Sequence, residues 1–353
     1  MTKQTGKSSS DVARRVTVRD IAAEIGVHFT TVAEALRDSP RVKEATKKKV
    51  RAAAEQMGYR SDPMLSALSA YRTRSSKPTF QGTLVWINGF GERDFFSKGR
   101  GFYTDCFAGA RRRCQELGYR LEPFWMSEPG MSAPRASQIL DSRKTSGVIV
   151  GPMPHGVDEL DLFWEKFCSV RIGYSLRSSE LTTIISDQFG NARMLFDRFK
   201  DAGYRRIGFA CPQALDDRTN NHWSGSYLAS QQHYPQMEQL HPFIDRNNDK
   251  SEFLSWMEAE KPDALICGGG RRYSDCLEAA GYRIPEQLSI ACLHADSYDE
   301  NLAGIMQNGE IVGTASVDHL VAIIHRFKVG LETHPKVVTV SGKWKDGTTF
   351  KSS

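Results

Sequence analysis

The sequence predicts two unlike parts, an all-α helix-turn-helix head and an α/β body of two doubly wound lobes. The head is indicated by residues 16–38, where apolar positions repeat at helical spacing on both sides of a glycine. The body is indicated by residues 80–345, where short apolar runs alternate with amphipathic helices, as in a parallel sheet. An uneven distribution of charge also separates the two parts.

The first helix of the head is predicted from four apolar residues that share one face: Val18, Ile21, Ala22 and Ile25. Thr17 is placed to cap this helix, with Asp20 three residues later as its partner in a capping box. Gly26 follows where the chain must turn sharply and where a positive φ costs other residues most. The segment therefore predicts a short helix with defined ends.

The second helix turns Val32 and Leu36 inward, one helical turn apart. Its opposite face is left for a partner outside the core: Phe29, Thr30, Ala33, Glu34 and Arg37. In a helix-turn-helix the second helix enters the major groove of DNA and its first residues meet base edges. An ordinary helical hairpin in an enzyme is the alternative interpretation.

A third helix is predicted over residues 42–58, and Gly58 is expected to end it. Four basic residues lie outside its apolar stripe: Lys47, Lys48, Lys49 and Arg51. Residues 1–77 contain 16 Lys and Arg against 8 Asp and Glu, whereas the rest of the chain contains 31 against 34. This asymmetry suits a small module that neutralises phosphates. Residues 1–15 are polar and are expected to form a disordered tail.

Residues 61–79 are expected to form a hinge helix and a linker between a head at 16–60 and the body. Asp62 suits an N-cap and Pro63 the first helical position. The helix would be only about two turns long, and helices shorter than ~12–15 residues are marginal in water. We therefore expect it to become ordered when something docks against it.

The order of these parts resembles that of the lac repressor and galactose repressor family of bacterial regulators. The resemblance covers nearly the whole chain and is strongest over residues 16–71. It implies that Phe29 and Thr30 read bases, that Thr31 contacts a phosphate, and that Leu68 is a wedge between base steps of the minor groove. A simple core leucine is the other interpretation of Leu68. The expected DNA-contacting residues are Thr17, Phe29, Thr30, Thr31, Ala33, Glu34, Arg37 and Leu68.

The head departs from the family pattern in two places. Ala33 and Glu34 stand where the family usually has Ser-Arg, and a glutamate can accept a hydrogen bond from cytosine but cannot donate one to guanine. Glu34 either changes the operator preference or pairs with a nearby basic residue. His28 and Lys43 replace the usual Ser caps, which is expected to loosen both helix starts.

In the body, eight strands are expected, at 83–88, 120–125, 147–150, 170–174, 184–187, 206–210, 264–267 and 289–293. Helices are expected at 102–117, 189–202 and 311–327, among others. Three helices end in the same dipeptide: Gly118-Tyr119, Gly203-Tyr204 and Gly281-Tyr282. Each glycine is expected to end its helix so that the chain turns into the next strand.

The family resemblance implies a periplasmic-binding-protein-like body with three crossovers between its lobes. Lobe one would comprise about 80–197 and 306–330, lobe two about 198–305 and 331–345, and residues 346–353 would form a tail. Ligands of such sheets bind beyond the carboxyl ends of the strands. The expected effector-binding residues are Asn88, Asp187, Asn221, His222, Trp223, Gly269, His294 and Gln307.

Each of these residues also has a simpler interpretation. A strand-end Asp most often caps the next helix, and a lone His is usually a surface residue or a hydrogen-bonded core residue. Sugar-responsive members of the family carry Arg at the position of His222, Asn-Asp at Gly269-Gly270, and an Asp near His294. The effector could therefore be larger or different in chemistry, or the response to a small molecule could be lost.

Enzyme and metal motifs are not found in the sequence. Gly268–Gly270 is neither a P-loop nor a dinucleotide fingerprint, and no G-x-S-x-G occurs. The nine His and seven Cys show no C-x-x-C or H-x-x-x-H spacing, so no metal and no cofactor are expected. An odd number of Cys in apolar segments suits a reducing cytosol. No segment resembles a signal peptide or a membrane span.

We therefore expect a cytoplasmic, nucleoid-associated transcriptional regulator, a repressor rather than an enzyme. It would bind double-stranded operator DNA as a homodimer and respond to a small molecule, such as a sugar or sugar derivative, bound between the lobes. The alternatives are a solute-binding protein or small-molecule enzyme on the same body, and a regulator that has lost its ligand response. The effector and the operator sequence are not predicted.

Overall fold

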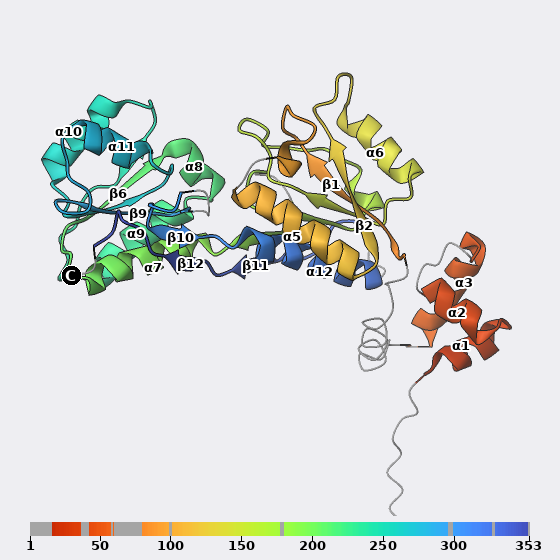
Figure 1. Ribbon diagram of the computed structural model, residues 1–353. Helices are drawn as coiled ribbons and strands as arrows, with labels where there is room; N and C mark the ends of the chain where they lie inside the picture. Colours follow the sequence, from red (N-terminus) through yellow and green to blue (C-terminus); the bar gives the residue numbers. More distant parts are fainter. Residues whose placement is uncertain are drawn as a thin grey trace, which may run out of the picture. The chain divides into compact units, whose positions relative to one another are not determined.

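The computed structural model describes residues 16–36, 42–57, 59, 80–98, 101–176, 180–295, 299–326 and 329–351. They belong to two compact units, Met1–Gln81 and Gly82–Ser353, and Figure 1 colours them along the chain. The expected tail at 1–15, the Gly58 helix stop, the hinge with Leu68, and Arg37 lie outside the described residues.

The head contains the three expected helices, α1 (Val18–Ile25), α2 (Phe29–Leu36) and α3 (Glu44–Gln56). Its core consists of eight side chains that are at most 8% exposed: Ile21, Ala22, Val32, Ala35, Val42, Val50, Ala53 and Ala54. Val18, Ile25 and Leu36 pack around them. The apolar faces predicted for the first two helices are confirmed.

The ends of α1 also form as predicted. The Thr17 hydroxyl accepts a hydrogen bond from the Asp20 amide, and the Asp20 carboxylate accepts one from the Thr17 amide, which completes a capping box. Gly26 ends the helix with φ +68°, in the left-handed region. Lys43 gives α3 no side-chain cap, as expected.

The body contains two six-stranded sheets, one in each lobe (Figure 1). All strands of the first sheet are parallel. Their order is β11 (Val337–Val340), β5 (Thr182–Ser186), β4 (Ser169–Ile172), β3 (Gly147–Val150), β1 (Gly82–Asn88), β2 (Tyr119–Trp125). Helices in this lobe are η1 (Phe95–Ser97), α5 (Phe102–Glu116), α6 (Ala133–Ser142), η2 (Trp164–Lys166) and α12 (Gly309–His325).

The second sheet has the same doubly wound order, with one antiparallel strand at its edge. Its order is β12 (Lys343–Lys345), β10 (Gly304–Met306), β9 (Ser289–Cys292), β8 (Ala264–Cys267), β6 (Ile207–Pro212), β7 (Phe243–Asp245). Its helices are α7 (Gln188–Asp201), α8 (Gln213–Arg218), α9 (His222–His233), α10 (Lys250–Glu260) and α11 (Arg272–Ala279).

All eight expected strands are present, with ends that differ by at most two residues. The three expected glycine stops have positive φ: +80° at Gly118, +88° at Gly203 and +91° at Gly281. The strands β7, β10, β11 and β12 were not predicted. Strands β7, β10 and β12 are only three residues long and carry little periodic signal, whereas β11 is a four-residue strand at the edge of the sheet.

The crossovers between the lobes differ from the expected positions. The first lies at Asp187 rather than after residue 197, because α7 packs its apolar stripe, which includes Leu195 and Phe199, into the core of the second lobe. The second lies at residues 307–308, directly after β10. The third lies at 341–342 rather than near 330, because β11 pairs with β5 in the first sheet.

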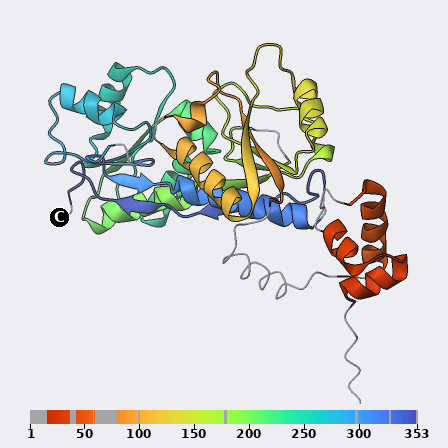
Figure 2. The same cartoon turned by 45° about the vertical axis from the view of Figure 1, so that its right-hand side comes forward.

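Two helices of the first lobe, α5 and α12, lie side by side over its sheet, as Figures 1 and 2 both show. Their backbones approach most closely where glycines face the partner helix, at Gly109 on α5 and at Gly309 and Gly313 on α12. The face of the sheet that α5 and α12 cover holds the main apolar core of the lobe, in which Trp86 and Leu320 are fully buried.

The C-terminal residues pack onto the second lobe. The Thr349 amide and carbonyl bond to the backbone of Asn301 and Ile290, and its hydroxyl donates to the Ile290 carbonyl. Phe350 packs against Phe199 and Trp344. Residues 346–351 are thus part of the folded lobe.

Candidate nucleic-acid interface and inter-lobe site

Helix α2 carries five of the eight residues predicted to contact DNA. The side chains of Val32 and Ala35 are fully buried, so the opposite face of the helix, at its first residues, points to solvent. Phe29 is 41% exposed and Thr30 is exposed, whereas Thr31, Ala33 and Glu34 are half-buried. The apolar ring of Phe29 is therefore the most prominent feature of the first turn.

His28 caps α2, so the expected loosening of this helix start is wrong. Its Nδ1 accepts a hydrogen bond from the Thr30 amide at 3.4 Å and lies 2.7 Å from the Thr30 hydroxyl. An imidazole nitrogen without a proton is a hydrogen-bond acceptor and can replace the oxygen of a Ser cap.

Arg19 contacts this surface, and other polar groups are exposed elsewhere on the head. The Arg19 guanidinium of α1 lies 5.5 Å from the centre of the Phe29 ring, within the range of a cation–π contact. Lys48 and Lys49 are exposed on α3. Thr17 is exposed as well, but its hydroxyl also donates to Asp20 at 2.7 Å within the capping box.

In the body, three of the expected effector residues come together at the carboxyl ends of the second sheet. The rings of Trp223 and His294 are parallel within 1°, with centres 5.8 Å apart. The Gln188 side-chain oxygen accepts hydrogen bonds from the Trp223 indole at 2.7 Å and from the Gln307 amide at 3.3 Å. Gln188 was not predicted, although its position directly after a strand-end Asp was a usable signal.

The two lobes touch each other through side chains that were not predicted either. The Tyr103 hydroxyl of the first lobe accepts hydrogen bonds from the Arg218 guanidinium of the second, from Nη2 at 2.8 Å and Nε at 3.2 Å. Tyr174 of the first lobe meets the expected residue His222 edge to face at 5.4 Å. Burial raises the pKa of Tyr174, so its phenol is neutral at physiological pH.

Four other expected residues, Asn88, Asp187, Asn221 and Gly269, hold or shape the local backbone. Asn88 donates to the Glu92 and Arg93 carbonyls and accepts from the Phe90 amide, and these bonds hold the loop after β1. Asp187 caps α7 through the Gly190 amide at 3.0 Å.

Asn221 is exposed and precedes α9 with φ +56°. Gly269 has φ +99°, and a Cβ there would lie 3.4 Å from Pro212. Both positions therefore shape the backbone beside the cluster formed by Trp223 and His294.

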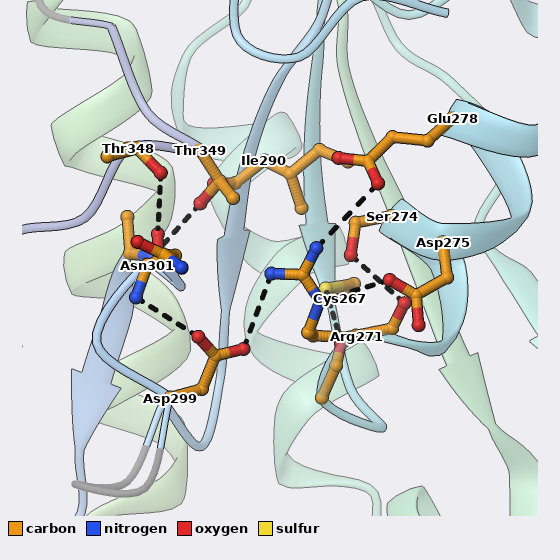
Figure 3. A network of polar contacts seen from close by, with 12 residues as sticks. Cys267, Arg271, Ser274, Asp275, Glu278, Ile290, Asp299, Asn301, Thr348 and Thr349 are labelled. Atoms are coloured by element: carbon orange, nitrogen blue, oxygen red, sulfur yellow. Dashed lines mark hydrogen bonds and ion pairs between the residues drawn. The ribbon is translucent and has the colours of Figure 1, made fainter. Parts of the chain in front are cut away.

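The charged groups that follow Gly269 are paired within the second lobe, as Figure 3 shows. Arg271 contacts the carboxylates of Asp275 at 3.0 Å, Asp299 at 3.5 Å and Glu278 at 3.7 Å. This network joins the start of α11 to the segment before β10.

All seven cysteines are buried and free of disulfides. Burial is the main cause that raises the pKa of the Cys114 thiol to about 12 and that of Cys168 to about 11. These two thiols stay protonated and behave as small apolar side chains. Among the described residues, no group of three or more His, Cys, Asp or Glu is placed to hold a metal ion. No helix within the described ranges is long and apolar enough to cross a membrane.

Two family models match the chain. The first, described as bacterial regulatory proteins of the lacI family, matches residues 17–62. The second, described as a periplasmic binding protein-like domain, matches residues 196–350. The first covers α1 to α3, and the second covers most of the second lobe.

Curated relatives match with low identity. The HTH-type transcriptional regulator PtxS of Pseudomonas plecoglossicida is 26% identical over 211 residues, which are 60% of this chain and 57% of the relative. The HTH-type transcriptional repressor PurR of Pectobacterium carotovorum subsp. carotovorum is 23% identical over 344 residues, which are 91% of this chain and 95% of the relative. The second match spans head and body together.

Solved structures share the fold. The complex of the transcriptional regulator CelR with cellobiose has a TM-score of 0.57 at 20% identity, and covers 95% of this chain and 100% of its own. The lac repressor dimer bound to operator and the anti-inducer ONPF has a TM-score of 0.55 at 15% identity, and covers 95% and 99%.

Proposed function

We propose that the chain, which matches the models of a lacI-family DNA-binding domain and of a periplasmic binding protein-like domain, is a DNA-binding transcriptional regulator, namely a repressor controlled by a small molecule. It binds operator DNA as a homodimer, on the nucleoid in the cytoplasm. Its relative PurR is named a repressor, and the lac repressor structure is a dimer on its operator. We assign it no enzymatic activity.

The exposed start of α2 is the single observation that carries the DNA-binding proposal. A helix whose buried face holds Val32 and Ala35 turns Phe29 and Thr30 to the outside at the position where this motif meets bases. The proposed contacts are Thr17, Phe29, Thr30, Thr31, Ala33 and Glu34, together with Arg37 and Leu68, which lie outside the described residues.

The cluster of Trp223, His294 and Gln307, together with His222, is the proposed effector site. An indole face beside an imidazole and two amides suits a polar small molecule with a ring or several hydroxyls, such as a sugar derivative. Asn221 and Gly269 border the same region. Asn88 and Asp187 have a smaller part in this proposal, because their polar atoms already hold a loop and a helix start.

Selection of bound sites from random DNA tests the first part of the proposal. We expect an enriched sequence with two related half-sites, and an affinity that falls with salt by about 0.9 log units per log unit for each phosphate contact. If no sequence is enriched by the folded protein, sequence-specific DNA binding is wrong.

A thermal-shift screen of sugars, sugar acids, polyols and purines tests the second part. A compound that raises the unfolding temperature and releases the operator would be the effector. Trp223→Phe removes the indole donor to Gln188 and should reduce that shift, whereas Trp344→Phe, on β12, should not. If no compound stabilises the protein, it regulates without a small-molecule response of this kind.

A further inference from the structure

The first two turns of α2 offer DNA an apolar surface with few hydrogen-bond donors. Phe29 and Ala33 have no polar side-chain atoms, and the Glu34 carboxylate only accepts hydrogen bonds when ionised. Thr30 carries the exposed hydroxyl of this surface, so its hydrogen bonding determines whether the surface can donate a hydrogen bond to a base.

The Thr30 hydroxyl is already engaged by His28. The Thr30 amide can only donate, and it points at the same Nδ1 that lies 2.7 Å from the hydroxyl. Nδ1 therefore carries no proton, and the hydroxyl donates its proton to Nδ1 rather than to a base. With its proton engaged by the cap, the hydroxyl has none to donate to a base and can only accept, and the methyl group is the apolar part of Thr30 that a partner can contact.

The ring of Phe29 is in contact with two neighbouring side chains. The His28 ring lies 4.4 Å from the Phe29 ring at an angle of 41°, and the Arg19 guanidinium lies 5.5 Å from its centre. A ring supported in this way loses little further freedom when it contacts a base.

We propose that α2 recognises its operator through the 5-methyl groups of thymine, with Phe29 and the Thr30 methyl as the specificity-determining contacts. In the major groove this methyl is the one apolar feature among the base edges, and Phe and Thr methyl groups match it. Glu34 would accept from an exocyclic amino group, on cytosine or adenine. The inference rests on the proposed function, since α2 must lie in the major groove.

Replacement of thymine by deoxyuridine removes only the methyl group and therefore tests this directly. In the selected operator, each dT is exchanged for dU in turn and affinity is measured by fluorescence anisotropy at fixed salt. We expect one or two positions in each half-site at which binding weakens about three- to tenfold, the range of a lost buried methyl contact.

Two substitutions at Thr30 separate its methyl from its hydroxyl. Thr30→Val keeps the methyl, so affinity should stay within about twofold and the dU effect should persist. Thr30→Ser keeps the hydroxyl and should abolish the dU effect at its base. Phe29→Ala should abolish it at the neighbouring base, whereas Lys48→Ala, at an exposed charge of α3, should leave every dU effect unchanged.

The outcomes separate this inference from the proposed function. A folded wild-type protein that binds its operator but tolerates dU at every position overturns the methyl readout alone. The same holds if Thr30→Val, folded by circular dichroism, loses specific binding more than about tenfold, because the hydroxyl would then read a base. A wild-type protein that selects no operator overturns both.

Discussion

The side-chain oxygen of Asn191 accepts a hydrogen bond from the Gly342 amide at 2.9 Å, and so joins two of the three crossovers between the lobes. Asn191 is 1% exposed, and its amide nitrogen donates to Ser186 at the end of β5. A Cβ at Gly342 would lie 2.6 Å from the Asn191 oxygen, so only glycine fits there. The remaining crossover, at residues 307–308, is connected to the first one by the hydrogen bond that the Gln307 amide donates to Gln188.

Asn191→Ala should therefore destabilise the body. It leaves the buried Gly342 amide and the Ser186 hydroxyl without this partner, at a cost of about 1–3 kcal/mol for each unsatisfied group. We expect the free energy of unfolding in urea to fall by about 2–4 kcal/mol. Gln236→Ala, at an exposed loop position, is the control and should change it by less than about 0.5 kcal/mol. A loss as small as that of the control would show that water replaces the amide.

Gly313→Ala should be one of the most damaging methyl additions in the chain. A Cβ at Gly313 would lie 1.8 Å from the Cys106 carbonyl oxygen and 2.9 Å from the Ala110 nitrogen, so α5 and α12 would have to separate. Overpacking of this kind costs about 1–3 kcal/mol or more.

Gly225→Ala is the matched control for Gly313→Ala. Gly225 lies in α9, is exposed, and has nothing within 4 Å of a Cβ, so alanine should stabilise the helix by about 0.5–1 kcal/mol. Chemical denaturation of both variants gives the comparison. Equal effects of the two substitutions would contradict the close contact between α5 and α12.

Local patterns along the chain were sufficient for much of the fold. The head, its capping box and the turn at Gly26 depend on neighbours in sequence, and they form as predicted. The eight predicted strands, which are four to seven residues long, were found for the same reason. Strand β11 was not, because it is a short edge strand with every second residue exposed.

Tertiary pairing explains what the sequence did not reveal. The apolar stripe of α7 suits packing on the sheet of either lobe. The sequence therefore did not show that this helix belongs to the second lobe. The partnership of Gln188 with Trp223 and that of Tyr103 with Arg218 join residues 35 and 115 positions apart, and no spacing rule connects them. His28 was misjudged because an imidazole is a rarer cap than a hydroxyl.

Tyr103→Phe should loosen the contact between the lobes. It removes the oxygen that accepts both Arg218 hydrogen bonds, which are charge-assisted but half-exposed, so we expect a cost of about 1 kcal/mol. Hydrogen exchange should become faster in the first turn of α5 and in α8, and the radius of gyration should increase in small-angle scattering. Tyr282→Phe, in the turn after α11, is the control. Unchanged exchange in both segments would show that the lobes hold together without this bond.

Two histidines on α12 should make the body less stable in mild acid. Burial lowers the pKa of His319 and His325 below the ordinary value of 6.5, and His325 lies 3.4 Å from the Tyr119 hydroxyl. Well above pH 6.5 both rings are neutral whether the chain is folded or not. As pH falls below 6.5, the unfolded chain takes up protons that the folded body resists, so the free energy of unfolding decreases.

The measurement is urea denaturation between pH 7.5 and pH 5, in which the slope of stability against pH counts the protons taken up on unfolding. His325→Gln should lower this uptake by up to about one proton in the acid part of the range, and the double variant with His319→Gln by up to about two. Gln232→Ala, at an exposed position of α9, is the control and should leave the slope unchanged. If the double variant keeps the slope of the wild type, carboxyl groups rather than these buried rings determine the loss of stability in acid.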